Sequence, residues 1–296
     1  MESLLLKPSS GEKTALIAGP VILLLAAIAY GFLDRNVSND TWISLASGRY
    51  IFTEGIVPRT DPFSYTFQGQ AWFNQNWLSH ALIYIAHHAF GGNGVIVATW
   101  LATALIVLLV LLAIYNRSGS WLAATLASAV FAWAVHGYFP PRPDTLGTFC
   151  LAATVCLLSA LAHHDGRHRR WPAVLLFPVF VFWGCAHGSF LFGYGLVGLF
   201  VLVYGLENML QDYDSFVNRS QLIFITASCT AALLLTIMLG PYGMDNFTHP
   251  FKVASSPLFR LVSEWVPPYR YVRGSSVFSF WQSISVAILT AIVISK

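Results

Sequence analysis

The hydrophobic positions of this chain fall in long runs that are separated by short polar segments. A helix needs about 20 apolar residues to cross the hydrocarbon core of a bilayer, and we identify eight runs that approach or reach this length. The pattern predicts an all-α integral membrane protein that forms a single transmembrane domain over residues 1–296. The predicted spans are 15–33, 94–115, 120–137, 145–162, 172–185, 188–206, 221–239 and 276–295.

One further apolar stretch, residues 77–90, is too short to cross the membrane easily. A tyrosine and three histidines lie near one face of it at helical spacing, and a glycine pair at 91–92 ends the run. We therefore predict an amphipathic helix that lies at the outer membrane interface. The residues of the polar face are His80, Tyr84, His87 and His88.

The composition supports a membrane protein and excludes several classes of function. Of 296 residues 56% are apolar and only 10% are charged, against roughly a quarter charged in a soluble domain. The mean hydropathy is +0.63, which excludes a disordered chain and argues against a soluble enzyme. The net charge of +3 includes no basic tract, so we expect no nucleic-acid partner. The four cysteines lie in or beside apolar runs and indicate no disulfide framework.

The basic residues set the orientation of the spans. Three arginines crowd the short segment 167–170, which the positive-inside rule places in the cytoplasm. Counting outward from this segment puts both termini in the cytoplasm, and two lysines ahead of the first span agree with that placement. Two large extracytoplasmic loops follow from this orientation, 34–93 and 240–275.

No Asp, Glu, Lys or Arg lies inside the predicted spans, and His136 lies near the end of one, which argues against ion-coupled transporters and pumps. Four short polar groups from distant parts of the chain fall on the outer side, and we expect them to converge on one rim. A carboxylate beside cations suits sugar transfer from a lipid phosphate. The carboxylate accepts the proton of the attacking hydroxyl, and Arg, His or a divalent metal stabilises the departing phosphate. The groups are Asp40, Arg142-Pro143-Asp144, His187 and Glu264-Trp265.

An ordered set of short motifs carries a family resemblance over roughly residues 34–268. It resembles the bacterial polytopic membrane proteins of the GT-C glycosyltransferase type, which are similar in plan to protein O-mannosyltransferases and aminoarabinose transferases. The motifs are DTWISLASGR from Asp40, GIVPRTDPFSYT from Gly55, Trp77-Leu78, Arg142-Pro143, WGCAHG from Trp183, Pro241-Tyr242-Gly243 and EWVPP from Glu264.

The resemblance implies an enzyme of a bacterial inner membrane that uses a polyprenyl-phosphate-linked sugar at the outer face. In such enzymes an acidic residue of the first outer loop acts as base or as ligand of a divalent metal. Asp40 matches that residue by position, Asp34 competes with it, and Asp61 is a third candidate. The expected contacts with phosphate and substrate come from Arg142, His187, Arg260 and Glu264.

Six of the seven candidate residues also have a simpler structural explanation. Asp40 would cap a short helix over 41–52, and Asp61, before Pro62, would open a turn with Ser64. Arg142 would anchor at the interface, His187 would occupy a tight turn, and Glu264 would pair with Arg260 along a helix.

Two further functions stay open beside the transferase. The family usually has a His after its Trp-aromatic pair and a Glu before Trp-Leu, where this chain has Ser44 and Asn76. Those replacements favour a catalytically inactive GT-C-derived scaffold that serves as accessory subunit of a membrane complex. The other alternative is a lipid carrier or flippase without ion coupling.

Overall fold

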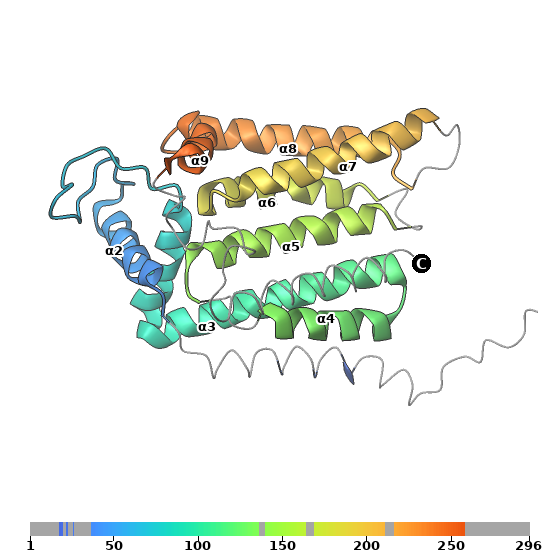
Figure 1. Ribbon diagram of the computed structural model, residues 1–296, viewed down its shortest axis with the longest axis horizontal. Helices are drawn as coiled ribbons and strands as arrows, with labels where there is room; N and C mark the ends of the chain where they lie inside the picture. Colours follow the sequence, from blue (N-terminus) through green and yellow to red (C-terminus); the bar gives the residue numbers. More distant parts are fainter. Residues whose placement is uncertain are drawn as a thin grey trace, which may run out of the picture.

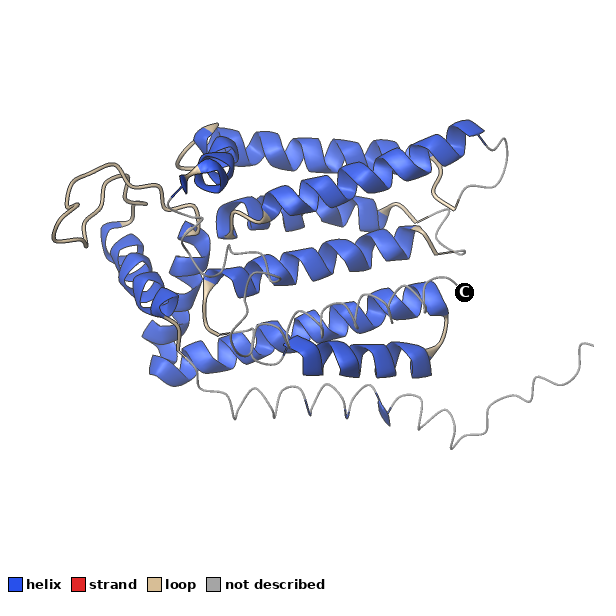
Figure 2. Cartoon of the chain, in the orientation of Figure 1, coloured by secondary structure: helices blue, strands red, loops and turns tan. Residues whose placement is uncertain are grey.

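The computed structural model describes residues 18–19, 22, 26, 37–135, 140–163, 169–210 and 216–257. This part of the chain is all-helical, with one isolated β-bridge between Thr60 and Ala71 (Figure 2). Its helices are α2 (Asn39–Glu54), α3 (Trp77–Ser118), α4 (Trp121–Val135), α5 (Pro143–Leu161), α6 (Trp171–Ala186), α7 (Phe190–Leu210), α8 (Arg219–Leu239) and α9 (Asp245–Ser255).

Four of these helices are long and apolar enough to cross a bilayer, as a multi-pass membrane protein requires. They are α3, α5, α7 and α8, and they contain the predicted spans 94–115, 145–162, 188–206 and 221–239 apart from residues at the ends. Two more apolar helices, α4 and α6, are shorter, with 15 and 16 residues. The last predicted span and nearly all of the first lie outside the described residues.

Helices α3 to α8 run side by side as a bundle, and α2 and α9 lie at one end of it (Figure 1). We call this end the α2 end. The largest fully buried side chains of the bundle lie on α6 and the start of α7, namely Phe180, Trp183 and Phe190. Gly193 of α7 lets the indole ring approach, because a Cβ at that position would lie 2.3 Å from Trp183 Cζ3. Aromatic packing on α6 thus fixes the helices that lead into the α2 end.

Helix α3 is broken where the glycine pair predicted the end of a helix. Phe90 (φ −138°, ψ 18°) and Gly91 (φ 61°, ψ −155°) are non-helical, and the second conformation is essentially restricted to glycine. We call the parts on either side α3a (77–89) and α3b (92–118). The helix predicted over 77–90 is therefore confirmed as a separate segment. Figure 1 shows α3a inclined steeply to α3b across the end of the bundle.

Helix α2 is longer than the helix expected over 41–52, and Asp40 is not its cap. Ser38 occupies the N-cap position and makes no side-chain cap hydrogen bond, while Asp40 lies within the first turn. The capping explanation was wrong because the Asp40 side chain turns toward Arg142 of another helix. The buried face of α2 consists of small residues, Thr41, Ser44, Ser47 and Gly48, so α2 approaches α3a closely.

Candidate functional site

Several helices begin at the α2 end of the bundle, and contacts join the N-terminal regions of four of them. Thr41 of α2 donates from Oγ1 to the carbonyl of Pro141, just before α5, at 2.7 Å. Gly147 of α5 packs on His187, ahead of α7, since a Cβ there would lie 3.0 Å from Nδ1. Gln75, just before α3, lies against Gly188. A Cβ on Gly188 would be 2.9 Å from the Oε1 atom of Gln75. The N-termini of α2, α3, α5 and α7 therefore converge.

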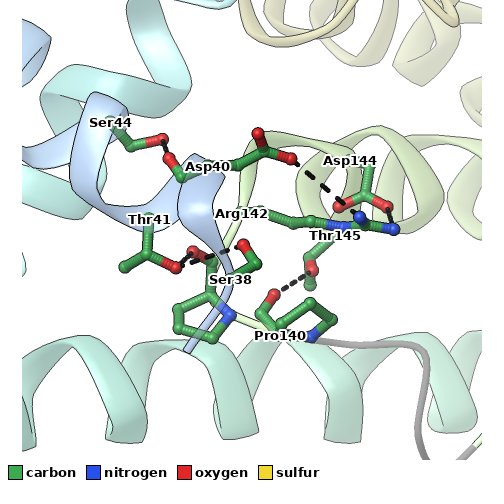
Figure 3. A network of polar contacts seen from close by, with 9 residues as sticks. Ser38, Asp40, Thr41, Ser44, Pro140, Arg142, Asp144 and Thr145 are labelled. Atoms are coloured by element: carbon green, nitrogen blue, oxygen red, sulfur yellow. Dashed lines mark hydrogen bonds and ion pairs between the residues drawn. The ribbon is translucent and has the colours of Figure 1, made fainter. Parts of the chain in front are cut away.

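Arg142 connects two carboxylates at this convergence (Figure 3). It takes the N-cap position of α5. Its Nη2 atom lies 2.7 Å from Asp144 Oδ2, and its Nη1 atom lies 4.0 Å from Asp40 Oδ2. The Arg142 side chain is only 16% exposed, whereas that of Asp40 is 55% exposed. The guanidinium is thus largely sheltered, and a solvent-accessible carboxylate stands beside it.

Local hydrogen bonds hold both partners of this pair in place. Ser44 Oγ donates to the carbonyl of Asp40 at 2.6 Å, which secures the first turn of α2. Thr145 Oγ1 donates to the carbonyl of Pro140 at 3.0 Å, which fixes the proline-rich turn that carries Arg142. Together with the bond from Thr41 to Pro141, these contacts set the position of Asp40 relative to α5.

His187 ends α6 with an extended backbone (φ −163°, ψ 140°). Its Nδ1 atom lies 2.8 Å from Ser189 Oγ, and it accepts from the Ser189 backbone N–H at 3.2 Å. An Nδ1 that accepts from a backbone N–H leaves the ring proton on Nε2. Burial and the nearby charge of Arg142 lower the pKa of His187 to about 4. At neutral pH, His187 is therefore an uncharged hydrogen-bond donor close to Arg142.

A layer of uncharged polar residues lies beside the charged group, and the sequence analysis missed most of it. Asn74 Nδ2 donates to Ser47 Oγ at 2.7 Å, and His80 Nδ1 lies 3.1 Å from the same oxygen. Ser79 Oγ donates to the carbonyl of Ala186 at 2.6 Å. These residues join α2, α3a and the end of α6. The sequence had marked His80 as part of a polar helix face, but it gave no sign that His80 and Asn74 meet at Ser47.

The two predicted outer loops contact each other through a tyrosine. Tyr242 O–H donates to the carbonyl of Pro58 at 2.9 Å, and its oxygen accepts from the Asn74 N–H at 2.9 Å. Arg59 Nη2 donates to the carbonyl of Pro241 at 2.7 Å. Tyr242 belongs to the motif Pro241-Tyr242-Gly243, which now has a structural role in joining the loops.

Asp61 opens a turn, as the sequence predicts, by accepting hydrogen bonds from residues that follow it. Its Oδ1 accepts from the N–H groups of Phe63 and Ser64 at 2.8 and 3.0 Å, and the Ser64 hydroxyl donates to Oδ2. These bonds, above all the one from the Ser64 hydroxyl, lower the pKa of Asp61. Its carboxylate thus serves the loop between α2 and α3.

Three other candidates, Asp34, Arg260 and Glu264, lie outside the described residues. The structure brings together Asp40, Arg142 and His187 of the predicted site residues. Asp144, from the predicted group Arg142-Pro143-Asp144, pairs with Arg142. Within the described ranges, no group of three or more His, Cys, Asp or Glu side chains is placed to hold a metal ion. Comparison of the chain with known protein families, with curated proteins and with solved structures finds no match in any of the three.

Proposed function

We propose that the α2 end binds the phosphate of a lipid-linked sugar and that the protein transfers this sugar to an acceptor hydroxyl at the outer membrane face. One observation carries the proposal. Asp40 and Arg142, from helices far apart in the chain, lie 4.0 Å apart where four helices begin. The proposal includes the GT-C plan, eight spans, cytoplasmic termini and a bacterial inner membrane.

The donors at this end suit a phosphate. The N-terminus of a helix carries a partial positive charge and unpaired N–H groups, so it favours anions. Arg142 adds a guanidinium whose fork geometry matches phosphate oxygens. Neutral His187 adds an N–H donor through Nε2. An anion at the mouth between α5 and α7 would meet all three kinds of donor.

The exposure of Asp40 supports its proposed role as the base. It is the most exposed member of the charged group, so an acceptor hydroxyl can reach it. In the proposed step the acceptor oxygen bonds the anomeric carbon and its proton passes to Asp40. The carbon–oxygen bond to the phosphate breaks, and the phosphate leaves with the electron pair and is stabilised by Arg142 and His187.

The residues present do not fit a divalent metal at Asp40. Arg142 contacts both Asp40 and Asp144, so its guanidinium already supplies the positive charge that a cation would bring between the two carboxylates. In the proposed step, Arg142 therefore supplies the positive charge, and His187 adds an uncharged donor.

The test uses the full chain in proteoliposomes with a panel of polyprenyl-phosphate-linked sugars. We expect Asp40→Asn to slow transfer by about 10²- to 10⁴-fold, the usual contribution of a general base. Asp245→Asn is the matched control, because Asp245 is an exposed aspartate paired with Lys252 on α9. Arg142→Gln should weaken binding of polyprenyl phosphate itself. Unchanged turnover of Asp40→Asn would remove Asp40 from the mechanism.

A second candidate is the inactive scaffold, and the surroundings of Ser44 favour it. Ser44 stands where the family usually has a His, and it is fully buried and bonded to the carbonyl of Asp40. The Arg142 ion pairs can equally be read as ties between α2 and α5. Stable co-purification with other membrane subunits, together with no binding of polyprenyl phosphate, would favour this function over the transferase.

A further inference from the structure

Over residues 79–85, the polarity of α3a is opposite to that of an amphipathic helix on a water-facing protein surface. His80 and Ser79 are buried, and Tyr84 packs its ring on Phe52 of α2 at a centroid distance of 5.5 Å. The apolar side chains of Leu82 and Ile85 are exposed. On the polar face, His80 is buried and Tyr84 packs on α2, whereas His87 and His88 near the end of α3a are exposed. The apolar face is turned outward.

The outward face of α3a is a continuous apolar stripe. Leu82, Ile85 and Ala89 follow one another at helical spacing and all are exposed, with Ile85 at 48%. Phe90 extends the stripe at the break and is 76% exposed. We call these four residues the α3a apolar face. No Asp, Glu, Lys or Arg occurs anywhere between residues 62 and 116, so nothing charged interrupts this surface.

The segment that follows the α3a apolar face also exposes apolar side chains. Beyond the break, α3b exposes Val97, Leu101 and Leu105, again at helical spacing. These residues belong to a helix that is long and apolar enough to cross a bilayer. Because α3a is inclined steeply to α3b (Figure 1), a membrane-crossing α3b would lay α3a along the boundary of the same bilayer.

We propose that the α3a apolar face rests on the lipids of the leaflet at the α2 end, while His80 and Tyr84 on the opposite face pack toward α2. Lipid fits this surface because apolar side chains favour the boundary between headgroups and acyl chains. In addition, no Asp, Glu, Lys or Arg on this helix would have to leave water. A second copy of the chain fits less well, since a stable interface needs about 800 Å² per partner and this face is one short helix. The proposal does not depend on the transferase.

The experiment places a single environment-sensitive fluorophore on the full chain in lipid nanodiscs. Cys156 and Cys185, which are partly exposed, are first replaced by serine, while Cys150 and Cys229 are buried. The label is then attached through Ile85→Cys or, as a smaller change, Ala89→Cys. Quenching is measured with doxyl lipids and with aqueous iodide. Thermal unfolding of each variant confirms that it is folded.

Two reference sites bracket the result. Thr53→Cys lies on the exposed side of α2 and reports water. The Thr53 hydroxyl hydrogen-bonds to Arg49, Tyr50 and Glu54 of the same helix. Leu101→Cys on α3b reports the bilayer interior. We expect doxyl lipids to quench the α3a labels several-fold more than the Thr53 label, with shallow doxyl groups more effective than deep ones. Aqueous iodide should quench the Thr53 label more than the α3a labels.

Two outcomes would overturn the proposal. Iodide quenching of the α3a labels at the level of Thr53 would place the face in water. Protection of the α3a labels from both quenchers would show that protein covers the face, and cross-linking would then test whether the cover is a second copy or another subunit.

Discussion

The carboxylate of Asp40 lies 4.0 Å from the Arg142 guanidinium, although Asp40 belongs to α2 and Arg142 to the start of α5. The contact from Arg142 to Asp144 is much shorter, at 2.7 Å. This difference separates two roles. Asp144 holds the guanidinium, and Asp40 shares its charge while remaining exposed. A phosphate that approaches Arg142 would therefore compete with Asp40 before it competes with Asp144.

Asp144→Asn should weaken phosphate binding without removing the base. The amide cannot hold Arg142 through a charge-assisted bond, so the guanidinium would lose its fixed direction. We expect the Kd for polyprenyl phosphate to rise about tenfold, the effect of about 1.4 kcal/mol. In a transfer assay KM should rise more than kcat falls, whereas Asp40→Asn should act mainly on kcat.

Two control variants accompany the Asp144→Asn measurement. Asp144→Glu keeps the charge and should restore part of the affinity, and Asp245→Asn changes an exposed pair elsewhere on the chain. Equal affinity of Asp144→Asn and the parent protein for polyprenyl phosphate would show that Asp144 does not position Arg142.

His187 should make stability depend on pH in a defined window. It lies in the turn between α6 and α7, and burial followed by the charge of Arg142 lowers its pKa from 6.5 to about 4. Between these values the unfolded chain binds more protons than the folded protein. The stability linked to neutral His187 is therefore complete above about pH 6.5 and is lost as pH falls toward 4.

Thermal unfolding in nanodiscs from pH 7.5 down to pH 4.5 measures this effect. The parent protein should lose more stability over this range than His187→Gln, which keeps a hydrogen-bonding side chain but does not titrate. Identical pH profiles for the two proteins would contradict a lowered pKa at His187.

The helices could be predicted from the sequence because their signals are local. Apolar runs located four spans to within a few residues at each end, and the glycine pair located the break in α3 because Gly91 needs a positive φ. The turn at Asp61 was also predictable, since its partners are two and three residues away.

The site was less predictable because it depends on contacts between distant segments. The capping role expected for Asp40 failed once Arg142 of α5 offered a charge partner. The group of Ser47, Asn74 and His80 carries no charge pattern and forms only when α2 packs on α3a. The orientation of α3a could not be read either, because helical spacing defines two faces without saying which one faces the protein.

Two glycines of α7 should respond oppositely to the same substitution. A Cβ at Gly193 would lie 2.3 Å from Trp183 Cζ3, and that indole is buried and cannot retreat. We expect Gly193→Ala to lower stability by about 1–3 kcal/mol, the usual cost of overpacking. At Gly198 no atom lies within 4 Å of a Cβ, so Gly198→Ala should be neutral or stabilising by up to about 1 kcal/mol.

Thermal unfolding of both variants in the same detergent or nanodisc tests the packing of α6 on α7. The tryptophan environment gives a second readout, since near-ultraviolet circular dichroism should change in Gly193→Ala and stay the same in Gly198→Ala. Equal melting temperatures would show that Trp183 does not pack on α7 as described.

The neighbouring glycines at the α3 break give the sharpest test of its cause. Both Gly91 and Gly92 have open space around a Cβ, but only Gly91 has a positive φ, 61°. Gly91→Ala adds no clash, so any loss of stability reports backbone strain, which costs about 1–3 kcal/mol. Gly92→Ala should be neutral. Because strain at residue 91 can be relieved by straightening α3, Gly91→Ala should also change the quenching of a label at Ile85→Cys. If the two alanine variants unfold at the same temperature and leave that quenching unchanged, the break does not depend on the left-handed conformation of Gly91.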